Sequence, residues 1–373
     1  MKTSIVTTTI NIPVLLTNYA RNARDYGHTE VDFIVIGDRK SASGTAEFCQ
    51  TINEYFPCTY LDIPAQEKYL NRFPELWRHL RFDSIQRRNI GMLMAYEQGA
   101  DIIITIDDDN FVMNQDFIGL HAIAGASPEL VSYASTSGWF NVCSALEADH
   151  GLSFYHRGYP QKMRWIESSH FISSVRSKRV IAVNAGLWLD NPDIDAVTRM
   201  ERQPVVRALK QPWTGNFSLS PGTWSPFNSQ NTAIMRAAIP AYFLSPYAGR
   251  YDDIWASYIL TRIVEHLGHA ISFGEPLVRQ ERNPHDLWKD LDVERNGMIM
   301  TDDFCEALRR VTLTGRSYSE CFAELAAKLP GAWPEAPGWT ESQNECRSRL
   351  LEGMEIWQGV FESLSAKRLE TVA

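Results

Sequence analysis

Three consecutive carboxylates, Asp107, Asp108 and Asp109, follow the apolar run Ile102–Ile106. The run is β-branched and indicates a buried strand, and three adjacent negative charges are costly to bury without a counter-charge. A hard divalent cation on carboxylate oxygens, completed by water and substrate phosphate, would neutralise them. At the carboxyl end of a central strand, such a site lies in the ligand crevice of an open α/β sheet. A solvated acidic turn is the alternative.

A second acidic residue, Asp38, follows another apolar run, Val31–Ile36, directly after Gly37. A strand that ends in Gly-Asp suits the close approach of a ligand, and Asp38 would accept hydrogen bonds from a base or ribose. A plain Gly-Asp turn explains the same residues. Thr9 and Asn11, where the first expected strand ends, are further candidates for nucleotide binding.

Two further groups have both a functional and a structural interpretation. Arg88 lies in a helix expected over residues 81–95, just before the acidic strand, where it would face phosphates or remain in solvent. Asp252 and Asp253 open a helix expected to run to about Leu267. Acidic residues in a first helical turn are favoured by the helix dipole, so capping alone would explain this pair.

The composition excludes several classes of protein. The chain has 373 residues, enough for one large domain or a domain with an appendage, and a net charge of −9 that argues against a nucleic-acid-binding surface. Its six cysteines lie far apart without a CxxC pair, which favours a reducing compartment and no zinc module. The N-terminus lacks a signal-peptide pattern, and no apolar run reaches the length of a membrane span. We therefore expect a cytoplasmic protein.

The elements that position these residues alternate between strand and helix along the first half of the chain. Such alternation predicts right-handed βαβ units and a mostly parallel sheet. The expected strands cover residues 4–10, 31–36, 58–63, 102–106, 180–183 and 231–235. The expected helices cover residues 14–26, 45–55, 81–95, 117–126 and 249–267.

The C-terminal part has a different pattern. Apolar residues recur at three- and four-residue spacing over residues 304–313, 318–329 and 340–367, which predicts helices. We therefore divide the chain into an α/β domain over residues 1–290, which contains all the candidate site residues, and a helical extension over residues 291–373. The extension is expected to pack on the sheet or to form a homo-oligomer interface.

Four sequence blocks, in order, resemble the reversibly glycosylated polypeptide family, which contains the plant UDP-arabinopyranose mutases. The resemblance spans residues 5–290, and the C-terminal helices carry no matching motif. The blocks are Thr105-Ile106-Asp107-Asp108-Asp109 with Phe111-Val112, Arg157-Gly158-Tyr159-Pro160 with Arg164, Gly186-Leu187-Trp188-Leu189 with Pro192-Asp193 and Asp195, and Gly249-Arg250-Tyr251-Asp252-Asp253 with Trp255-Ala256.

The resemblance implies a GT-A-type, Rossmann-like fold and manganese or magnesium on Asp107 and Asp109. It also implies a nucleoside diphosphate sugar as the substrate, with Asp108 and Trp188 among the binding residues. The implied reaction exchanges the pyranose and furanose forms of the sugar without a separate acceptor. Within the family, the chain looks most similar to bacterial GDP-fucopyranose/GDP-fucofuranose mutases.

Two positions depart from the plant pattern. The family arginine that becomes glycosylated follows Arg-Gly-Tyr-Pro by four residues, which selects Arg164, but its distance to Gly-Leu-Trp-Leu selects Arg176. We favour Arg164, because its local motif is intact. The plant-type histidine is replaced by Val278-Arg279-Gln280, so His285 becomes the metal-ligand candidate, with a surface histidine as the alternative.

These residues suggest roles in the exchange. Metal on the acidic triplet would neutralise the leaving diphosphate, and Arg88 and Arg164 would add fixed positive charge. Asp252 or Asp253 would handle the proton of the hydroxyl that becomes the new ring oxygen. A glycosyltransferase that uses a separate acceptor and a non-catalytic nucleotide-sugar-binding subunit are the competing interpretations.

Overall fold

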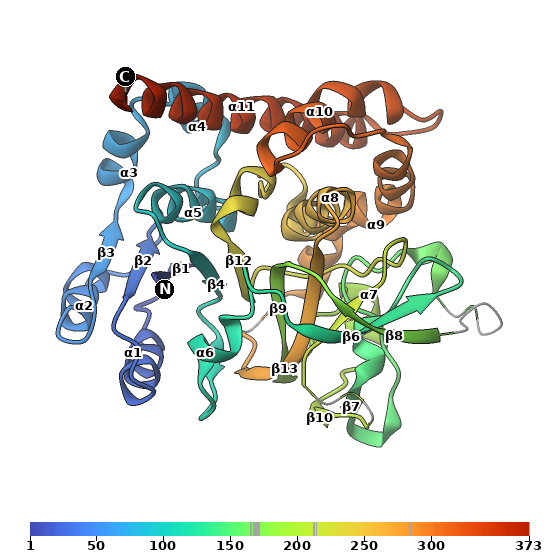
Figure 1. Ribbon diagram of the computed structural model, residues 1–373, viewed down its shortest axis with the longest axis horizontal. Coiled ribbons are helices and arrows are strands. Elements are labelled where there is room, and N and C mark those ends of the chain that lie inside the picture. The colour runs from blue at the N-terminus through green and yellow to red at the C-terminus, as the bar shows by residue number, and fades with distance from the viewer. Residues whose placement is uncertain (165, 167–171, 212, 214, 284, 373) are drawn as a thin grey trace.

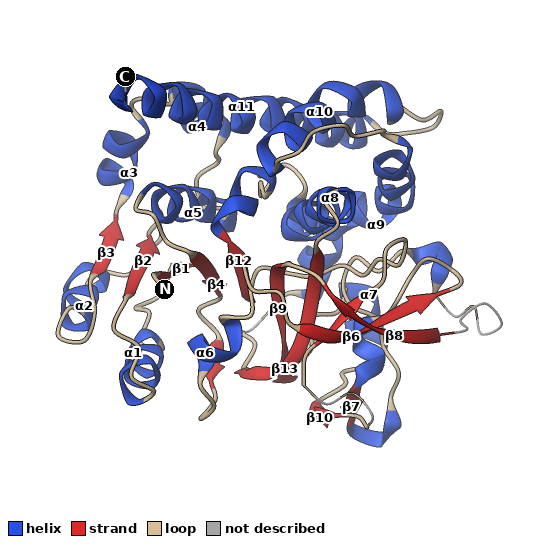
Figure 2. Ribbon diagram, viewed as in Figure 1, coloured by secondary structure: helices blue, strands red, loops and turns tan. Residues whose placement is uncertain are grey.

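The computed structural model describes residues 1–164, 166, 172–211, 213, 215–283 and 285–372. One sheet runs through the molecule with helices on both of its faces, and the C-terminal helices lie together along one side (Figures 1 and 2). The expected α/β fold with a C-terminal helical extension is confirmed.

The N-terminal half of the sheet is parallel. Its four strands, in spatial order, are β3 (Cys58–Leu61), β2 (Val31–Ile36), β1 (Thr3–Thr8) and β4 (Ile102–Ile106). All five residues of β4 are buried, as its unbroken β-branched run predicts. The helices of this half are α1 (Leu16–Asp25), α2 (Thr45–Ile52), α3 (Ile63–Leu70), α4 (Pro74–His79), α5 (Arg88–Glu97) and α6 (Phe117–His121), with the 3₁₀ turn η1 (Ile85–Arg87) before α5.

The other half of the sheet joins through β12 (Asn231–Met235), which pairs antiparallel with β4. Beyond it the order is β9 (Ile181–Asp190), β13 (Ala270–Gln280), β11 (Phe217–Leu219), β6 (Glu129–Ser135) and β8 (Ile172–Lys178). Three short strands extend this half of the sheet: β5 (Asn110–Val112) pairs with β13, β10 (Val206–Leu209) pairs with β9, and β7 (Leu146–Ala148) pairs with β10. The same part of the chain contains α7 (Ala196–Glu201) and the 3₁₀ turns η2 (Val142–Ala145), η3 (Asp149–Gly151) and η4 (Gln161–Met163).

The chain then becomes mainly helical. Its elements are η6 (Arg236–Ala241), η7 (Gly249–Tyr251), α8 (Asp252–His266), α9 (Leu287–Arg310), α10 (Tyr318–Ala332) and α11 (Glu341–Val372). The boundary expected after residue 290 falls inside α9, and one hydrophobic cluster contains both Met92 of α5 and Trp357 of α11. The C-terminal helices therefore share a core with the sheet.

Candidate active site

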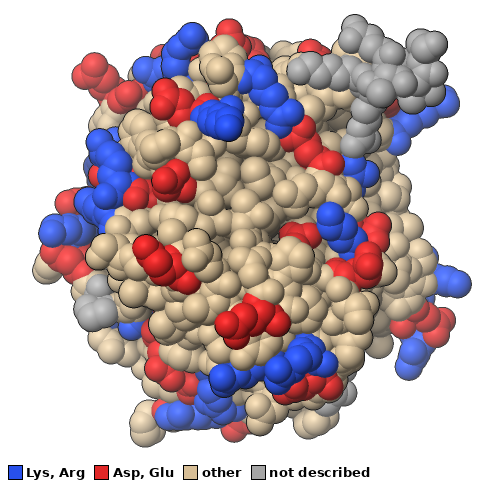
Figure 3. Space-filling view, turned by 90° about the vertical axis from the view of Figure 1, so that its left-hand side faces the viewer, with Lys and Arg blue, Asp and Glu red and all other residues tan. Residues whose placement is uncertain are grey.

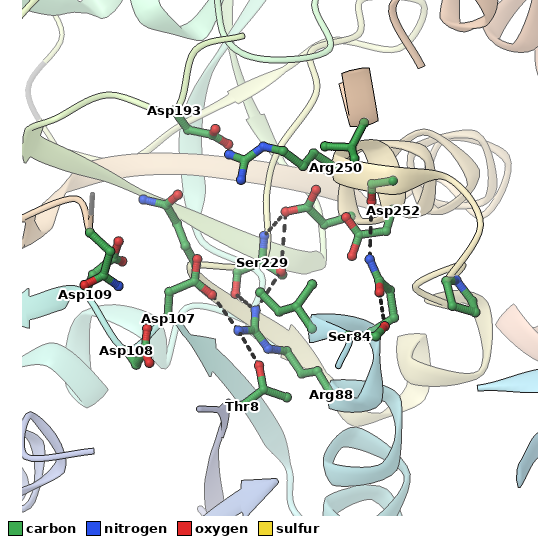
Figure 4. A pocket seen from close by; sticks show the side chains of 18 of the residues that line it. Thr8, Ser84, Arg88, Asp107, Asp108, Asp109, Asp193, Ser229, Arg250 and Asp252 are labelled. Atoms are coloured by element: carbon green, nitrogen blue, oxygen red, sulfur yellow. Dashed lines mark hydrogen bonds and ion pairs between the residues drawn. The ribbon is translucent and has the colours of Figure 1, made fainter. Parts of the chain in front are cut away.

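A cleft of about 500 Å³ lies where the carboxyl ends of β1 and β4 meet the N-termini of α5 and α8. Parallel strands present their carboxyl ends at one edge, which makes this the ligand-binding edge of an α/β sheet. Residues from distant parts of the chain line it: Thr8, Arg81–Gln86, Arg88, Asp107–Asp109, Arg157, Asp193, Ser229, Gln230, Pro246, Gly249, Arg250, Asp252, Asp253, Gln280, Arg282, Asn283, His285 and Val293. Figure 4 shows the side chains of 18 of these residues, which converge on the cleft.

The acidic triplet enters this cleft from the end of β4, as predicted. The Asp108 carboxylate accepts hydrogen bonds from Thr9 Oγ1 at 2.9 Å and Asn11 Nδ2 at 3.4 Å. Burial, together with the charges of Asp107 and Asp108, raises the pKa of Asp109 to about 7. Thr9 and Asn11 therefore contact the acidic triplet, whose clustered carboxylates disfavour one another's ionisation.

Arg88 supplies positive charge directly beside the triplet. Its side chain is fully buried, and one guanidinium nitrogen lies 2.5 Å from Asp107 Oδ1 (Figure 4). The other terminal nitrogen donates to the backbone oxygen of Ser229 at 2.9 Å and to its hydroxyl at 2.8 Å. Arg88 opens α5, so the expected helix over residues 81–95 begins later than predicted, and residues 81–84 form part of the cleft wall instead.

A second, buried arginine connects two of the other sequence blocks. Arg157 makes two hydrogen bonds to the carboxylate of Asp193, at 2.8 and 2.9 Å, and two to that of Asp253, at 3.1 and 3.3 Å. Although burial alone would raise it, Arg157 holds the pKa of Asp193 well below its usual range. Asp253 also accepts from the Ser229 backbone N–H at 3.0 Å, which ties this network to Arg88.

Asp252 lies beside Asp253 but in different surroundings. Burial and the neighbouring Asp253 charge raise its pKa to about 7. Within the described residues, no lysine, arginine or histidine forms an ion pair with Asp252, although its side chain lines the cleft. The interpretation of this pair as helix capping alone does not account for the two hydrogen bonds between Arg157 and Asp253.

A smaller cavity of about 200 Å³ adjoins the cleft and shares Thr8 and Asp108 with it. Asp38 and Thr9, both predicted to bind the nucleotide, line this cavity. The Asp38 carboxylate also accepts the backbone N–H groups of Arg39 at 2.8 Å and Ser84 at 3.0 Å, so it shapes the loop at the same time.

His285 lines the cleft, and its Nδ1 lies 3.0 Å from Asp290 Oδ2. Burial would raise the pKa of Asp290, but its contacts with His285, Arg250 and Arg282 lower it to about 2. A carboxylate on one ring nitrogen is the usual orienting partner of a metal-binding histidine and leaves Nε2 available. In the described part of the chain, however, no three His, Cys, Asp or Glu side chains form a group that could hold a metal.

Four predicted residues line neither cavity. Asn11 is exposed and reaches the site only through its hydrogen bond to Asp108. Trp188 is buried, with its ring 5.8 Å from that of His156. Arg164 is also buried and lies 2.5 Å from Asp195, whereas Arg176 is 69% exposed on β8 and lies 3.7 Å from Glu129.

Other cleft residues were not predicted as site residues. Arg157, Asp193 and Arg250 stand inside the family blocks, so the sequence does contain a signal for them. Ser229 and Arg282 lie in no motif, and only the fold brings them to the cleft.

Comparison with known proteins decides the family. Residues 67–358 match the reversibly glycosylated polypeptide family. The chain belongs to this family. It is 31% identical over 236 residues to UDP-arabinopyranose mutase 3 of Arabidopsis thaliana, covering 60% of this chain and 59% of that protein. It is 28% identical over 237 residues to probable UDP-arabinopyranose mutase 1 of Pisum sativum, covering 61% and 60%.

The chain thus spans about 60% of the length of these relatives. Among solved structures, this family member is similar to Staphylococcus aureus TarS 1–349 in complex with UDP-GlcNAc, with a TM-score of 0.43, 11% identity and coverage of 98% and 92%. Glucosyl-3-phosphoglycerate synthase from Mycobacterium tuberculosis with phosphoglyceric acid gives a TM-score of 0.41, 12% identity and coverage of 84% and 82%. These distant similarities carry no functional argument.

Two further observations concern the charge of the surface and the polarity of the helices. Figure 3 shows acidic and basic side chains interspersed over one face, without a single dominant basic area. Along the described residues, every helix is too short or too polar to span a bilayer.

Proposed function

We propose that this protein is a nucleotide-sugar mutase that interconverts the pyranose and furanose forms of a nucleoside diphosphate sugar. Membership of a family whose named relatives are UDP-arabinopyranose mutases is the observation that carries the proposal. The cleft adds chemical support, because it joins an acidic triplet, buried arginines and a carboxyl group whose pKa is about 7.

We propose GDP-L-fucose as the nucleotide sugar. The similarity of the sequence blocks to bacterial GDP-fucopyranose/GDP-fucofuranose mutases supports this choice over the UDP-arabinopyranose of the plant relatives. The cavity beside Asp38 is the proposed nucleoside site, and the larger cleft would contain the diphosphate and the sugar.

We further propose that Asp107, Asp109 and His285 hold Mn²⁺ or Mg²⁺. Two observations support this ligand set: burial and the neighbouring carboxylate charges raise the pKa of Asp109, and His285 is oriented by Asp290. These ions commonly bind through one or two carboxylates, with substrate phosphate oxygens completing their coordination, so the three side chains need not be gathered into a preformed group before the nucleotide binds. When bound, such an ion would act as a Lewis acid toward the diphosphate.

The remaining chemistry is assigned to side chains of the chain. Arg88 is fixed by Asp107 and Ser229, so its charge is available without reorganisation as the diphosphate departs. The cleft walls would hold the freed sugar and diphosphate together until they recombine. The role of the family arginine remains a prediction for Arg164, which reaches Asp195 rather than the cleft.

Ring-form analysis tests the proposal directly. Purified protein with Mn²⁺ is incubated separately with GDP-L-fucose and with UDP-arabinopyranose, without any acceptor, and the products are read by NMR. Formation of a furanose nucleotide supports the mutase. Sugar transfer only after an acceptor is added would instead identify a glycosyltransferase, and binding without either reaction would identify a non-catalytic subunit.

A further inference from the structure

The adjacent carboxyl groups of Asp252 and Asp253 differ in how firmly they are held. Both Asp253 oxygens accept from Arg157, and Oδ2 also accepts from the backbone and hydroxyl of Ser229 at 3.0 and 3.4 Å. Hydrogen bonds from charged donors to both oxygens fix the position of this carboxylate and occupy its acceptor sites. Asp253 is therefore held in place by its neighbours.

Asp252 has no comparable partner. Its neighbours are Gln86, whose side chain hydrogen-bonds it, the guanidinium groups of Arg157 and Arg88, and the neutral Tyr242. Neither arginine is in ion-pair contact with it within the described residues, because Arg157 is engaged by Asp193 and Asp253 and Arg88 by Asp107. Asp252 is thus the member of the pair that can exchange a proton with a ligand in the cleft.

The proposed reaction has a specific proton requirement. After the bond from C1 to the phosphate oxygen breaks, a sugar hydroxyl oxygen forms a new bond to C1 and loses its proton. The bond from C1 to the former ring oxygen then breaks, and that oxygen gains a proton to become a hydroxyl. The diphosphate finally re-forms its bond to C1. The overall exchange consumes no proton, so one carboxyl group can accept the proton and return it.

We propose that Asp252 is this single proton carrier, and that Asp253, anchored by Arg157 and Ser229, is a positioning residue that keeps a fixed negative charge beside it. The inference rests on the proposed mutase function and assigns separate roles to the two carboxyl groups. As a carboxylate, Asp252 takes the proton from the attacking hydroxyl. As a carboxylic acid, it delivers the same proton to the departing ring oxygen.

The acidity of Asp252 suits both halves of this cycle. Burial and the Asp253 charge raise its pKa to about 7, in opposition to the lowering effects of Arg157 and Gln86. A group that must act as base and then as acid works best when its pKa is near the working pH. An ordinary solvent-exposed aspartate would be a poor general acid at neutral pH, because it is almost entirely ionised and has no proton to donate.

Positional isotope exchange separates this role from the other steps. A GDP-L-fucose substrate carries ¹⁸O in the bridge between C1 and the β-phosphorus, and cleavage followed by rotation moves the label into non-bridging positions. Asp252→Asn is expected to lose furanose formation by about a hundred- to ten-thousandfold while isotope exchange continues. Asp252→Glu should recover part of the ring exchange, and Asp303→Asn on the exposed part of α9 is the matched control.

Asp253→Asn tests the positioning role. Removal of the neighbouring negative charge favours ionisation of Asp252, so the pH at which the ring-exchange rate is half-maximal should move to lower values. A general loss of packing would lower the rate without moving that pH. If this variant does not fold, the ¹³C shift of the Asp252 carboxyl in the wild-type protein, assigned with Asp252→Asn, must titrate near pH 7.

The outcomes distinguish the two proposals. Absence of furanose product from wild-type protein with every nucleotide sugar would refute the mutase function itself. Active wild-type protein together with normal ring exchange in Asp252→Asn, or loss of isotope exchange along with ring exchange, would overturn the proton-carrier role. An unmoved pH profile in folded Asp253→Asn, or an Asp252 titration near pH 4, would overturn the positioning role.

Discussion

Arg157→Ala should destabilise the protein strongly, because Arg157 is the main counter-charge for two buried carboxylates. The Arg157 side chain is 8% exposed, those of Asp193 and Asp253 are 3% and 9% exposed, and four hydrogen bonds join them. Removal of one partner from a buried charged group typically costs about 3–5 kcal/mol, since the remaining charge stays desolvated. At about 2.1 cal/mol/K per residue for the unfolding entropy, a chain of this length should lose roughly 4–6 °C in Tm.

Thermal unfolding followed by circular dichroism, with urea titration at 25 °C, measures this cost. Arg176→Ala is the matched control, because its pair with Glu129 is exposed on β8 and such pairs contribute about 0–1 kcal/mol. Arg157→Met combined with Asp253→Asn should recover part of the lost stability, because Asp193 is then the only one of the two carboxylates left buried without its arginine. A Tm of Arg157→Ala within about 1 °C of the wild type, which by the same entropy scale is under 1 kcal/mol, would refute the view that this network is essential to the fold.

Three further predictions concern activity. Asp109→Ala should abolish turnover and weaken Mn²⁺-dependent nucleotide binding, measured by calorimetry, with an unchanged circular dichroism spectrum; full activity in excess chelator would contradict the metal site. Arg164→Ala should lose about a hundred- to a thousandfold in rate if it contacts the departing diphosphate, and Arg176→Ala should change little. The reverse pattern would transfer the family role to Arg176. GDP-L-fucose should exceed UDP-arabinopyranose in kcat/KM, and the opposite ranking would change the proposed substrate while leaving the reaction intact.

The N-terminal half of the fold was predictable because its signals are local. The apolar runs at residues 31–36 and 102–106 match β2 and β4, and residues 231–235 match β12. The eleven-residue strand β13 was not predicted: its central Gly274 and Pro276 interrupt the apolar pattern, and the register with β9 shifts at these positions. Pairing with the long strand β9 therefore outweighed the tendency of this glycine and proline to interrupt a strand.

The candidate site likewise contains some residues that local sequence signals could place and others that only the fold brings together. Asp107–Asp109 could be placed at the cleft from the sequence, because a buried strand that ends in carboxylates has a defined position in an α/β sheet. Ser229 could not, since it lies in a segment rich in Pro, Gly and Ser and reaches Arg88 across 141 positions of sequence. Arg164 shows the limit of motif spacing, which predicts proximity to the sugar but carries no information about the ion pair with Asp195.

The contacts also explain why separate blocks depend on one another. Asp193 is held by Arg157, Arg157 holds Asp253, and Asp253 accepts from Ser229, which in turn binds Arg88 next to Asp107. Each carboxylate in this chain is tolerable in a buried site only because the next residue supplies a donor. Asp252 stands beside this chain of contacts without an ion pair among the described residues, and its pKa is raised accordingly. An acid without an ion pair beside a paired network is suited to general acid–base chemistry, because such a group is free to change its charge.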